Sequence, residues 1–154
     1  MKSNTTAKEQ ALNPQPVSRV QVQPSTSSDQ LDDRLLGALH AASEKKALDV
    51  VVLDLRDIAS FTDFFVIASG ANERQVQAIS DEVYESLKKS GTTAARVEGY
   101  KTAEWILLDY GDFVVHVFEQ KARAFYDLER LWRESKRVAL PPGLFVDSSL
   151  RNES

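Results

Sequence analysis

Hydrophobic residues recur along the chain at intervals that predict three main helices and about five strands. Leucine and alanine at helical spacing indicate a first helix that begins at Ser28 or Asp29, both good N-cap residues, and ends near residue 47. The β-branched run at residues 50–55 is continuous, which favours a strand covered on both faces. A second strand is expected at residues 64–68.

A capping-box pattern marks the start of the second helix, which is expected over about residues 73–89. Asn72 can accept a hydrogen bond from the backbone of Gln75, and Gly91 follows the helix where a residue with positive φ is favoured. The predicted buried face consists of four aliphatic residues: Val76, Ile79, Val83 and Leu87.

The second half of the chain predicts a hairpin and a third helix. Three strands are expected over residues 92–97, 105–109 and 113–118, with a turn at 110–112 between the last two. The last helix is expected over about residues 120–132, and its predicted buried side chains are Phe125, Leu128 and Leu131 or Trp132. Together these elements predict an α/β (α+β) domain with one mixed sheet.

Composition divides the chain into a domain and two tails. Residues 1–28 are rich in Gln, Ser, Thr and Pro, which predicts a disordered tail; a transit peptide is the alternative, because the segment is also rich in serine. The folded domain is expected over residues 29–134. Pro141, Pro142 and Gly143 interrupt regular structure, so residues 135–154 are expected to form a carboxyl-terminal tail.

Charge and composition narrow the classes of function. Among 154 residues, 19 Lys and Arg stand against 23 Asp and Glu, a net charge of −4 without a long basic run, so nonspecific binding to nucleic-acid phosphates is not expected. The absence of cysteine excludes disulfides and thiolate metal ligands, and it agrees with a cytoplasmic location. No apolar stretch approaches the roughly 20 residues needed to cross a bilayer, so no membrane partner is expected.

The predicted hairpin has two apolar faces. Alternation places Trp105, Leu107 and Asp109 on one face, and Ile106, Leu108 and Tyr110 on the other. An exposed antiparallel strand normally has one polar face, so either the protein's own helices bury both faces or a partner covers one. Trp105 is therefore either a core residue or the anchor of a binding site, since tryptophan is enriched among interface hot spots.

Few residues are arranged for catalysis. Asp54, Asp57 and Asp63 could serve as metal ligands for phosphoryl transfer, but their spacing does not guarantee that they project from one face. Asp63 could be a buried hydrogen-bonding acid, a partner contact or a catalytic carboxylate, and structural capping of the adjacent loop is favoured. His116 lies within a predicted strand, with no nucleophile or second histidine at a recognisable offset, so a structural role is expected. We expect no enzyme activity, no cofactor and no metal.

Seven short motifs follow one another through the predicted core. They are DLR at residues 54–56, TDFFVIASG at 62–70, RQV at 74–76, EG at 98–99, WILLDYGD at 105–112, VHVF at 115–118 and FYDLERLW at 125–132. Together they closely resemble the ribosomal silencing factor RsfS family, also called Iojap, over roughly residues 31–134. Both tails lie outside the resemblance.

The resemblance implies a fold similar to that of nucleotidyltransferases without their catalytic residues. It also implies that the protein binds ribosomal protein L-fourteen on the large ribosomal subunit, sterically blocks joining of the small subunit and represses translation. An assembly factor for the large subunit would use the same surface, and a surviving nucleotidyltransferase activity is the enzyme alternative. Three arginines of the last helix form either a solvated face or a peripheral contact with ribosomal RNA: Arg123, Arg130 and Arg133.

The family's recognition surface, carried onto this chain, would include Trp105, Leu107 and Asp109, to which we add Asp63 and Tyr126. The resemblance also implies a homodimer when the protein is free of the ribosome. The dimer would shield the same apolar strands, so dimerisation and ribosome binding would compete.

Overall fold

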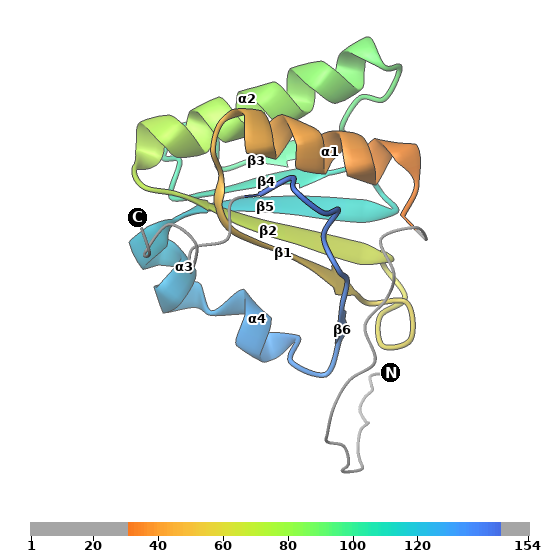
Figure 1. Cartoon of the computed structure of the whole chain (residues 1–154). Helices are drawn as coiled ribbons and strands as arrows, with labels where there is room; N and C mark the ends of the chain where they lie inside the picture. Colours follow the sequence, from red (N-terminus) through yellow and green to blue (C-terminus); the bar gives the residue numbers. More distant parts are fainter. Residues whose placement is uncertain (1–30, 146–154) are drawn as a thin grey trace.

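The computed structural model describes residues 31–145, which form a six-stranded mixed sheet with helices on both faces (Figure 1). In chain order the elements are α1 (Asp33–Glu44), β1 (Leu48–Asp54), β2 (Phe64–Gly70), α2 (Glu73–Lys89), β3 (Arg96–Glu98), β4 (Trp105–Asp109), β5 (Phe113–Glu119), α3 (Gln120–Tyr126), α4 (Leu128–Leu131) and β6 (Lys136–Arg137). The strand order is β3-β4-β5-β2-β1-β6. Only β2 and β5 pair in parallel among these strands. The predicted fold class is therefore confirmed, with one more strand than expected.

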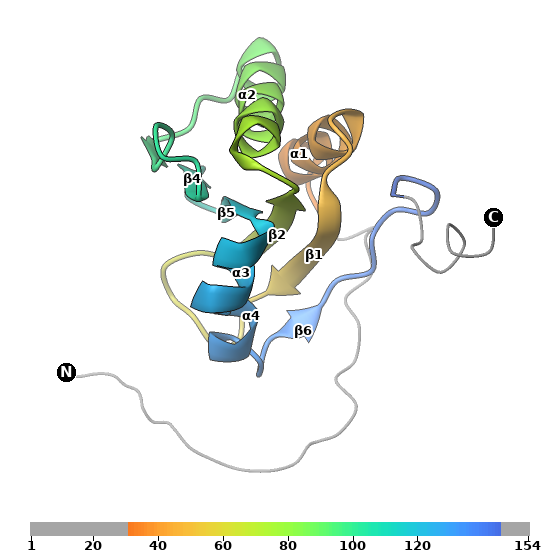
Figure 2. The same ribbon diagram turned by 90° about the vertical axis from the view of Figure 1, so that its left-hand side faces the viewer.

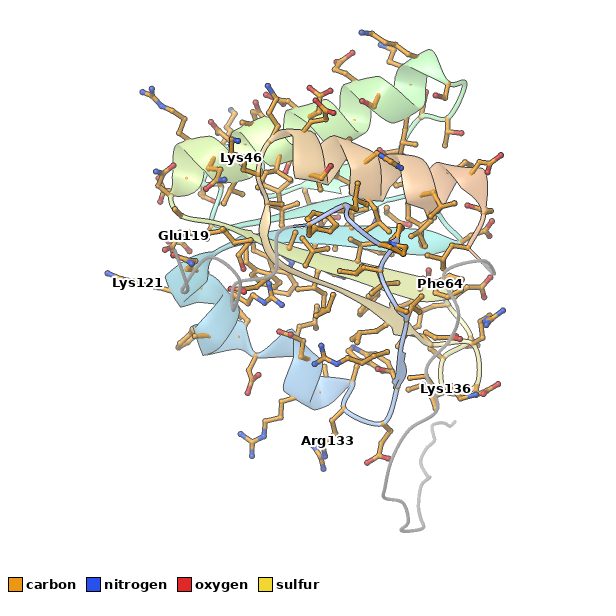
Figure 3. The ribbon with its side chains drawn as sticks, in the orientation of Figure 1. Lys46, Phe64, Glu119, Lys121, Arg133 and Lys136 are labelled. Carbon is orange, nitrogen blue, oxygen red and sulfur yellow. The ribbon has the colours of Figure 1, made fainter. Side chains whose placement is uncertain are left out.

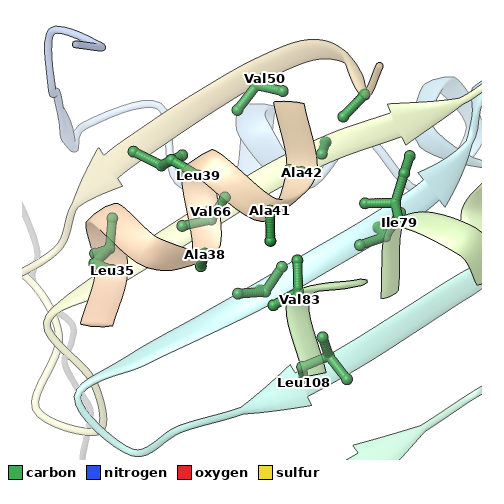
Figure 4. Packing of buried hydrophobic residues seen from close by; sticks show 14 of the residues in the cluster. Leu35, Ala38, Leu39, Ala41, Ala42, Val50, Val66, Ile79, Val83 and Leu108 are labelled. Carbon is green, nitrogen blue, oxygen red and sulfur yellow. The ribbon is translucent and has the colours of Figure 1, made fainter. Parts of the chain in front are cut away.

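Helices α1 and α2 lie side by side on one face of the sheet and bury the larger hydrophobic core (Figures 1 and 4). All four residues predicted for the buried face of α2 are at most 2% exposed. The predicted start of α2 is also confirmed, because the Gln75 N–H donates to Asn72 Oδ1 at 2.9 Å. Gly91 follows the helix with φ of 98°, the conformation for which glycine was expected.

The short helices α3 and α4 lie on the opposite face and bury a smaller core (Figure 2). Its buried members are Leu53, Leu55, Phe65, Ile67, Val114, Phe118, Ala122 and Leu128. The two helices have seven and four residues, and α3 packs against β5 and β2. Eleven helical residues are too few to cover this side of a six-stranded sheet, so the face of β4 remains partly open.

The last predicted helix is wrong as a single element. Asp127 adopts left-handed backbone angles, with φ and ψ both 51°, and this residue separates α3 from α4. The break changes the helical periodicity, so that Phe125, which was expected to be buried, is 80% exposed. Of the two alternatives Leu131 and Trp132, Leu131 is 72% exposed, whereas Trp132 is partly buried against the smaller core. Leu128 is buried as predicted.

The first helix begins later than predicted. Asp32, not Ser28 or Asp29, is the N-cap of α1, and its Oδ1 accepts a hydrogen bond from the Leu35 N–H at 3.0 Å. Ser28 and Asp29 themselves lie outside the described residues, as does the whole predicted tail over residues 1–28.

Residues 136–145 pack against the domain, in contrast to the tail expected after residue 134. Strand β6 pairs with β1, and the N–H of Val138 donates to the carbonyl oxygen of Val52 at 2.9 Å. The Val138 side chain is buried, and three further apolar side chains are partly buried against the larger core: Leu140, Leu144 and Phe145. This segment, which we call the carboxyl-terminal strap (residues 136–145), therefore belongs to the folded domain.

Candidate functional site

Strand β4 has one covered and one partly open face. Ile106 and Leu108 are buried in the core beneath α2, whereas Trp105, Leu107 and Asp109 alternate with them and remain partly exposed. The alternation predicted for the hairpin is confirmed. Trp105 and Leu107 pack at the margin of the smaller core without being enclosed by it, so the indole stays partly exposed.

The indole of Trp105 is held by aromatic neighbours on two elements, β5 and α3. It stacks on Phe118 of β5 at 4.9 Å between ring centroids and contacts Tyr126 of α3 at the same distance. Its Nε1–H donates to Nδ1 of His116 at 3.1 Å. Packing from below and one hydrogen bond therefore fix a large apolar ring that is still partly exposed.

His116 is buried directly beneath this surface. It is 3% exposed, and the edge of its ring meets Phe65 with centroids 4.4 Å apart. Burial lowers the pKa of His116 to about 4, although the negative charge of Asp109 opposes the shift. The imidazole is therefore neutral near pH 7, and since Nδ1 accepts from Trp105, the ring proton is on Nε2. Nε2 has no hydrogen-bond partner among residues 31–145.

Tyr126 lies at the end of α3 and is 48% exposed beside Trp105. The corner between α3 and α4 is fixed by Arg123, which donates to Ser69 Oγ at 2.9 Å and to both carboxylate oxygens of Glu129 at 3.1 and 2.9 Å. These charged hydrogen bonds lower the pKa of Glu129. Arg123 thus connects α3, α4 and β2 and keeps Tyr126 against the indole.

The three arginines of this region are not equivalent. The Arg123 side chain is only 12% exposed, so the expectation of a solvated face fails for this residue, because it makes the buried contacts that hold the corner. Arg130 and Arg133 are exposed, and Figure 3 shows Lys121 and Arg133 directed away from the ribbon.

The two acidic residues predicted for the site occupy different places. Asp109 ends β4, where its carboxylate accepts from the Gly111 N–H at 2.9 Å and pairs with Arg96 at 3.3 Å. Asp63 is exposed and precedes Phe64, which pairs with Phe113 at the start of β5. Trp105 pairs with Phe118 near the other end of that strand. The structure therefore brings Trp105, Leu107 and Tyr126 together, with Asp109 farther along β4 and Asp63 at the opposite end of the sheet.

A chain of aromatic contacts runs from this site to the exposed Phe61 in the loop before β2, a feature that the sequence pattern did not predict. Phe61 is 60% exposed and lies 6.0 Å from Phe65 and 5.8 Å from Trp132, measured between ring centroids. Phe65 in turn contacts His116. The sequence signal was the phenylalanine at position 61 just before the two phenylalanines of β2, but a loop residue has no periodicity that reveals its neighbours.

Two of the three carboxylates considered for metal binding, Asp54 and Asp57, are engaged elsewhere. Asp54 is buried and accepts two hydrogen bonds from the Arg56 guanidinium at 3.0 and 2.8 Å, while Asp57 pairs with Lys136 at 3.2 Å. Residues 31–145 contain no group of three or more His, Cys, Asp or Glu side chains that could hold a metal ion. Across the same residues, no helix has the length and apolar character to span a membrane.

The sequence and the fold are similar to those of known proteins. The family model described as ribosomal silencing factor during starvation matches residues 28–153. A ribosomal silencing factor from Halalkalibacterium halodurans is 45% identical over 103 residues, which cover 67% of this chain and 88% of the relative. A crystal structure of a protein from Bacillus halodurans matches with a TM-score of 0.63 at 44% identity, covering 69% of this chain and 96% of that one.

A more distant relative carries a different name. The Mus musculus protein named mitochondrial assembly of ribosomal large subunit protein 1 is 30% identical over 92 residues, which cover 58% of this chain and 40% of that protein. The family model, in contrast, spans every residue that the structure describes. The chain therefore belongs to the RsfS family of ribosomal silencing factors, as its ordered motifs predicted.

Proposed function

We propose that this protein represses translation by docking on ribosomal protein L-fourteen of the large ribosomal subunit and blocking the approach of the small subunit. The observation that carries the proposal is the partly open face of β4, where Trp105 is held firmly from below and remains accessible from outside. Membership of the RsfS family supplies the ribosome as the target. The site of action would be the cytoplasm.

Trp105 would be the anchor of the docking surface, which we define as Trp105, Leu107 and Tyr126. Tryptophan and tyrosine are among the residue types most enriched at interface hot spots, and these three side chains are contiguous and partly or largely exposed. Asp109 would lie on the polar rim. Asp63 would contact the partner only if the interface extended to the opposite end of the sheet. A specific complex that buries about 800 Å² on each partner is large enough to extend that far.

The mechanism is steric and requires no chemical step. A folded domain bound where the small subunit must dock excludes it, and the free energy of binding becomes the free energy of inhibition. The docking surface would also attract a second copy of the chain when no ribosome is present. In the proposed homodimer the same apolar side chains are covered, so dimerisation would lower the apparent affinity for the ribosome. Arg130 and Arg133 would add peripheral contacts to ribosomal RNA.

Sedimentation of mixed ribosomal subunits tests the proposal. Adding the full chain to separated subunits under associating conditions should retain free large subunits in proportion to the protein added, with the protein cosedimenting with them. Unchanged joining at saturating protein would contradict the proposal. Crosslinking of the bound protein to the large subunit, followed by identification of the crosslinked ribosomal protein, tests whether L-fourteen is the contacted component.

Assembly of the large subunit is the second candidate function, favoured by the name of the mouse relative. A factor that binds a late precursor would use the same docking surface, and its depletion would accumulate incomplete large subunits. If depletion of the protein leaves the large subunits complete, and large and small subunits then join in excess during starvation, the result supports silencing instead. The composition of the large-subunit peak after depletion separates the two functions.

A further inference from the structure

We propose that His116 is a positioning residue of the docking surface: its Nδ1 atom fixes the indole of Trp105 in the orientation that a partner meets. The inference rests on the proposed docking function and assigns a role to a buried side chain that would not itself touch the partner. Its basis is the 3.1 Å hydrogen bond from Trp105 Nε1 to His116 Nδ1 and the burial of the imidazole, which is 3% exposed.

The register of the sheet explains how the two side chains meet. Trp105 is directly opposite Phe118, and His116 is directly opposite Leu107, so the indole reaches diagonally across the β4–β5 pair to the imidazole. All of these side chains face the side of the sheet that carries α3 and α4. The indole therefore packs on Phe118 and bonds to His116 at the same time, and the two contacts together restrict both of its side-chain torsions.

Among the described residues, His116 forms one side-chain hydrogen bond, which it accepts from the indole of Trp105. One ring edge faces Phe65, another ring lies 6.3 Å away at Phe118, and Nε2 has no hydrogen-bond partner within residues 31–145. An apolar side chain would fill this position without leaving a buried polar atom unpaired. What the imidazole contributes beyond packing is the acceptor for Trp105.

Orientation matters because the indole is at the margin of the core. Phe118 and Tyr126 contact the ring, but they do not restrict its rotation as a hydrogen bond does. A large side chain that is mobile before binding must be ordered when the partner arrives, and this ordering weakens affinity. The His116 acceptor would remove that penalty in advance, so that the partner meets a pre-organised anchor.

Two substitutions of His116 separate positioning from packing. His116→Phe keeps an aromatic ring and removes the acceptor, whereas His116→Asn keeps an acceptor oxygen near the position of Nδ1. Calorimetric titration of L-fourteen should show affinity about tenfold weaker for His116→Phe, the upper range expected for ordering one large side chain. His116→Asn should bind within about threefold of the wild type. Equal losses for the two variants would overturn the inference.

A second readout follows the indole without a partner. In a Trp132→Phe background, Trp105 is the sole tryptophan, and its fluorescence anisotropy decay reports ring mobility. Mobility should rise in His116→Phe and return toward the wild-type value in His116→Asn. If His116→Phe does not fold, the rate of hydrogen exchange between the Trp105 indole N–H and solvent is measured instead, in the protein that retains His116. Slow exchange supports the bond, and exchange as fast as in a free indole overturns it.

A double-mutant cycle distinguishes failure of this inference from failure of the proposed function. In a Trp105→Ala background, His116→Phe should cause no further loss of affinity, because His116 acts through the indole. If Trp105→Ala weakens binding and His116→Phe weakens it additively, the positioning role is wrong while the docking function stands. If Trp105→Ala leaves binding unchanged, the docking function itself is wrong.

Discussion

The environment of single residues decides whether the proposed docking surface has a defined shape. Trp105 could be assigned from the sequence to an alternating strand, and its position at a face without full helical cover confirms that alternation. Its bond to His116 could not be assigned, since the two residues are 11 positions apart and meet diagonally across a hairpin. Periodicity places side chains on a face, but it does not give the rotamers that join them.

Protonation of His116 should make stability depend on pH. The unfolded histidine titrates near 6.5, and burial lowers the folded pKa to about 4, so the neutral form is favoured by folding. The contribution of His116 to the free energy of unfolding is therefore fully present above pH 6.5 and is lost as the pH drops from 6.5 toward 4. The slope of this loss approaches about 1.4 kcal/mol per pH unit, and the whole loss is about 3 kcal/mol.

Urea unfolding of the wild type and of His116→Asn at pH 7, 6, 5 and 4.5 measures this dependence. The wild type should lose stability more steeply below pH 6.5 than the variant. Parallel curves for the two proteins would show that His116 does not titrate as its burial implies.

Gly99 lies where a side chain would collide with the backbone of strand β4. Its φ is +82°, and a Cβ atom there would meet the carbonyl oxygen of Trp105. Gly99→Ala should cost about 2 kcal/mol or more, because backbone strain and a steric clash combine. Gly111 has a similar φ of +85°, but a Cβ atom there would meet no heavy atom within 4 Å, so Gly111→Ala is the matched control. Equal losses in denaturant unfolding would rule out the clash.

At the scale of elements, the corner between α3 and α4 is the feature that sequence patterns describe least well. Residues 120–132 have a helical pattern, but Asp127 in a left-handed conformation ends α3 and redirects the chain. Asn and Asp adopt this conformation more readily than most residues, yet the preference is too weak to predict a break. The hairpin, in contrast, was located almost to the residue because a short turn fixes its register.

The Arg123–Glu129 pair should stabilise this corner and the position of Tyr126. Arg123→Ala removes three hydrogen bonds to partly buried groups, and we expect a loss of about 2 kcal/mol in stability, within the range for hydrogen bonds to charged groups. The exposed Arg130 offers the control, since Arg130→Ala should change stability by less than about 0.5 kcal/mol. Thermal unfolding of both variants gives the comparison, and indistinguishable midpoints would contradict the assigned role.

At the scale of the whole molecule, the two faces of the sheet are covered unequally. Helices α1 and α2 close one face over the larger core, the carboxyl-terminal strap covers the β1 side, and α3 with α4 leave β4 partly open. The shortage of helices was foreseeable from the count of elements. The packing of the strap could not be predicted from the sequence, because its two prolines and a glycine suggest an irregular tail. Its few apolar residues show no periodicity, and their burial depends on contacts with the larger core that form only in the folded domain.

The strap should contribute to the stability of the whole domain. Val138→Ala removes two buried methyl groups, and at about 0.8 kcal/mol for each buried carbon we expect a loss of about 1.5 kcal/mol. Leu131→Ala removes more carbon from a side chain that is 72% exposed, and it should have little effect on stability. Chemical unfolding of the full chain measures both changes. Unchanged stability of Val138→Ala would place the strap outside the cooperative unit.

The affinity of the Trp105→Ala variant for large ribosomal subunits tests the docking surface most directly. Removing a hot-spot anchor should weaken binding by about 2 kcal/mol or more, roughly 30-fold in Kd, while the variant stays folded. Tyr100→Ala, on an aromatic residue that is 40% exposed and bonded to Asp81 of α2, should bind as the wild type does. Wild-type affinity in a folded Trp105→Ala protein would contradict the account.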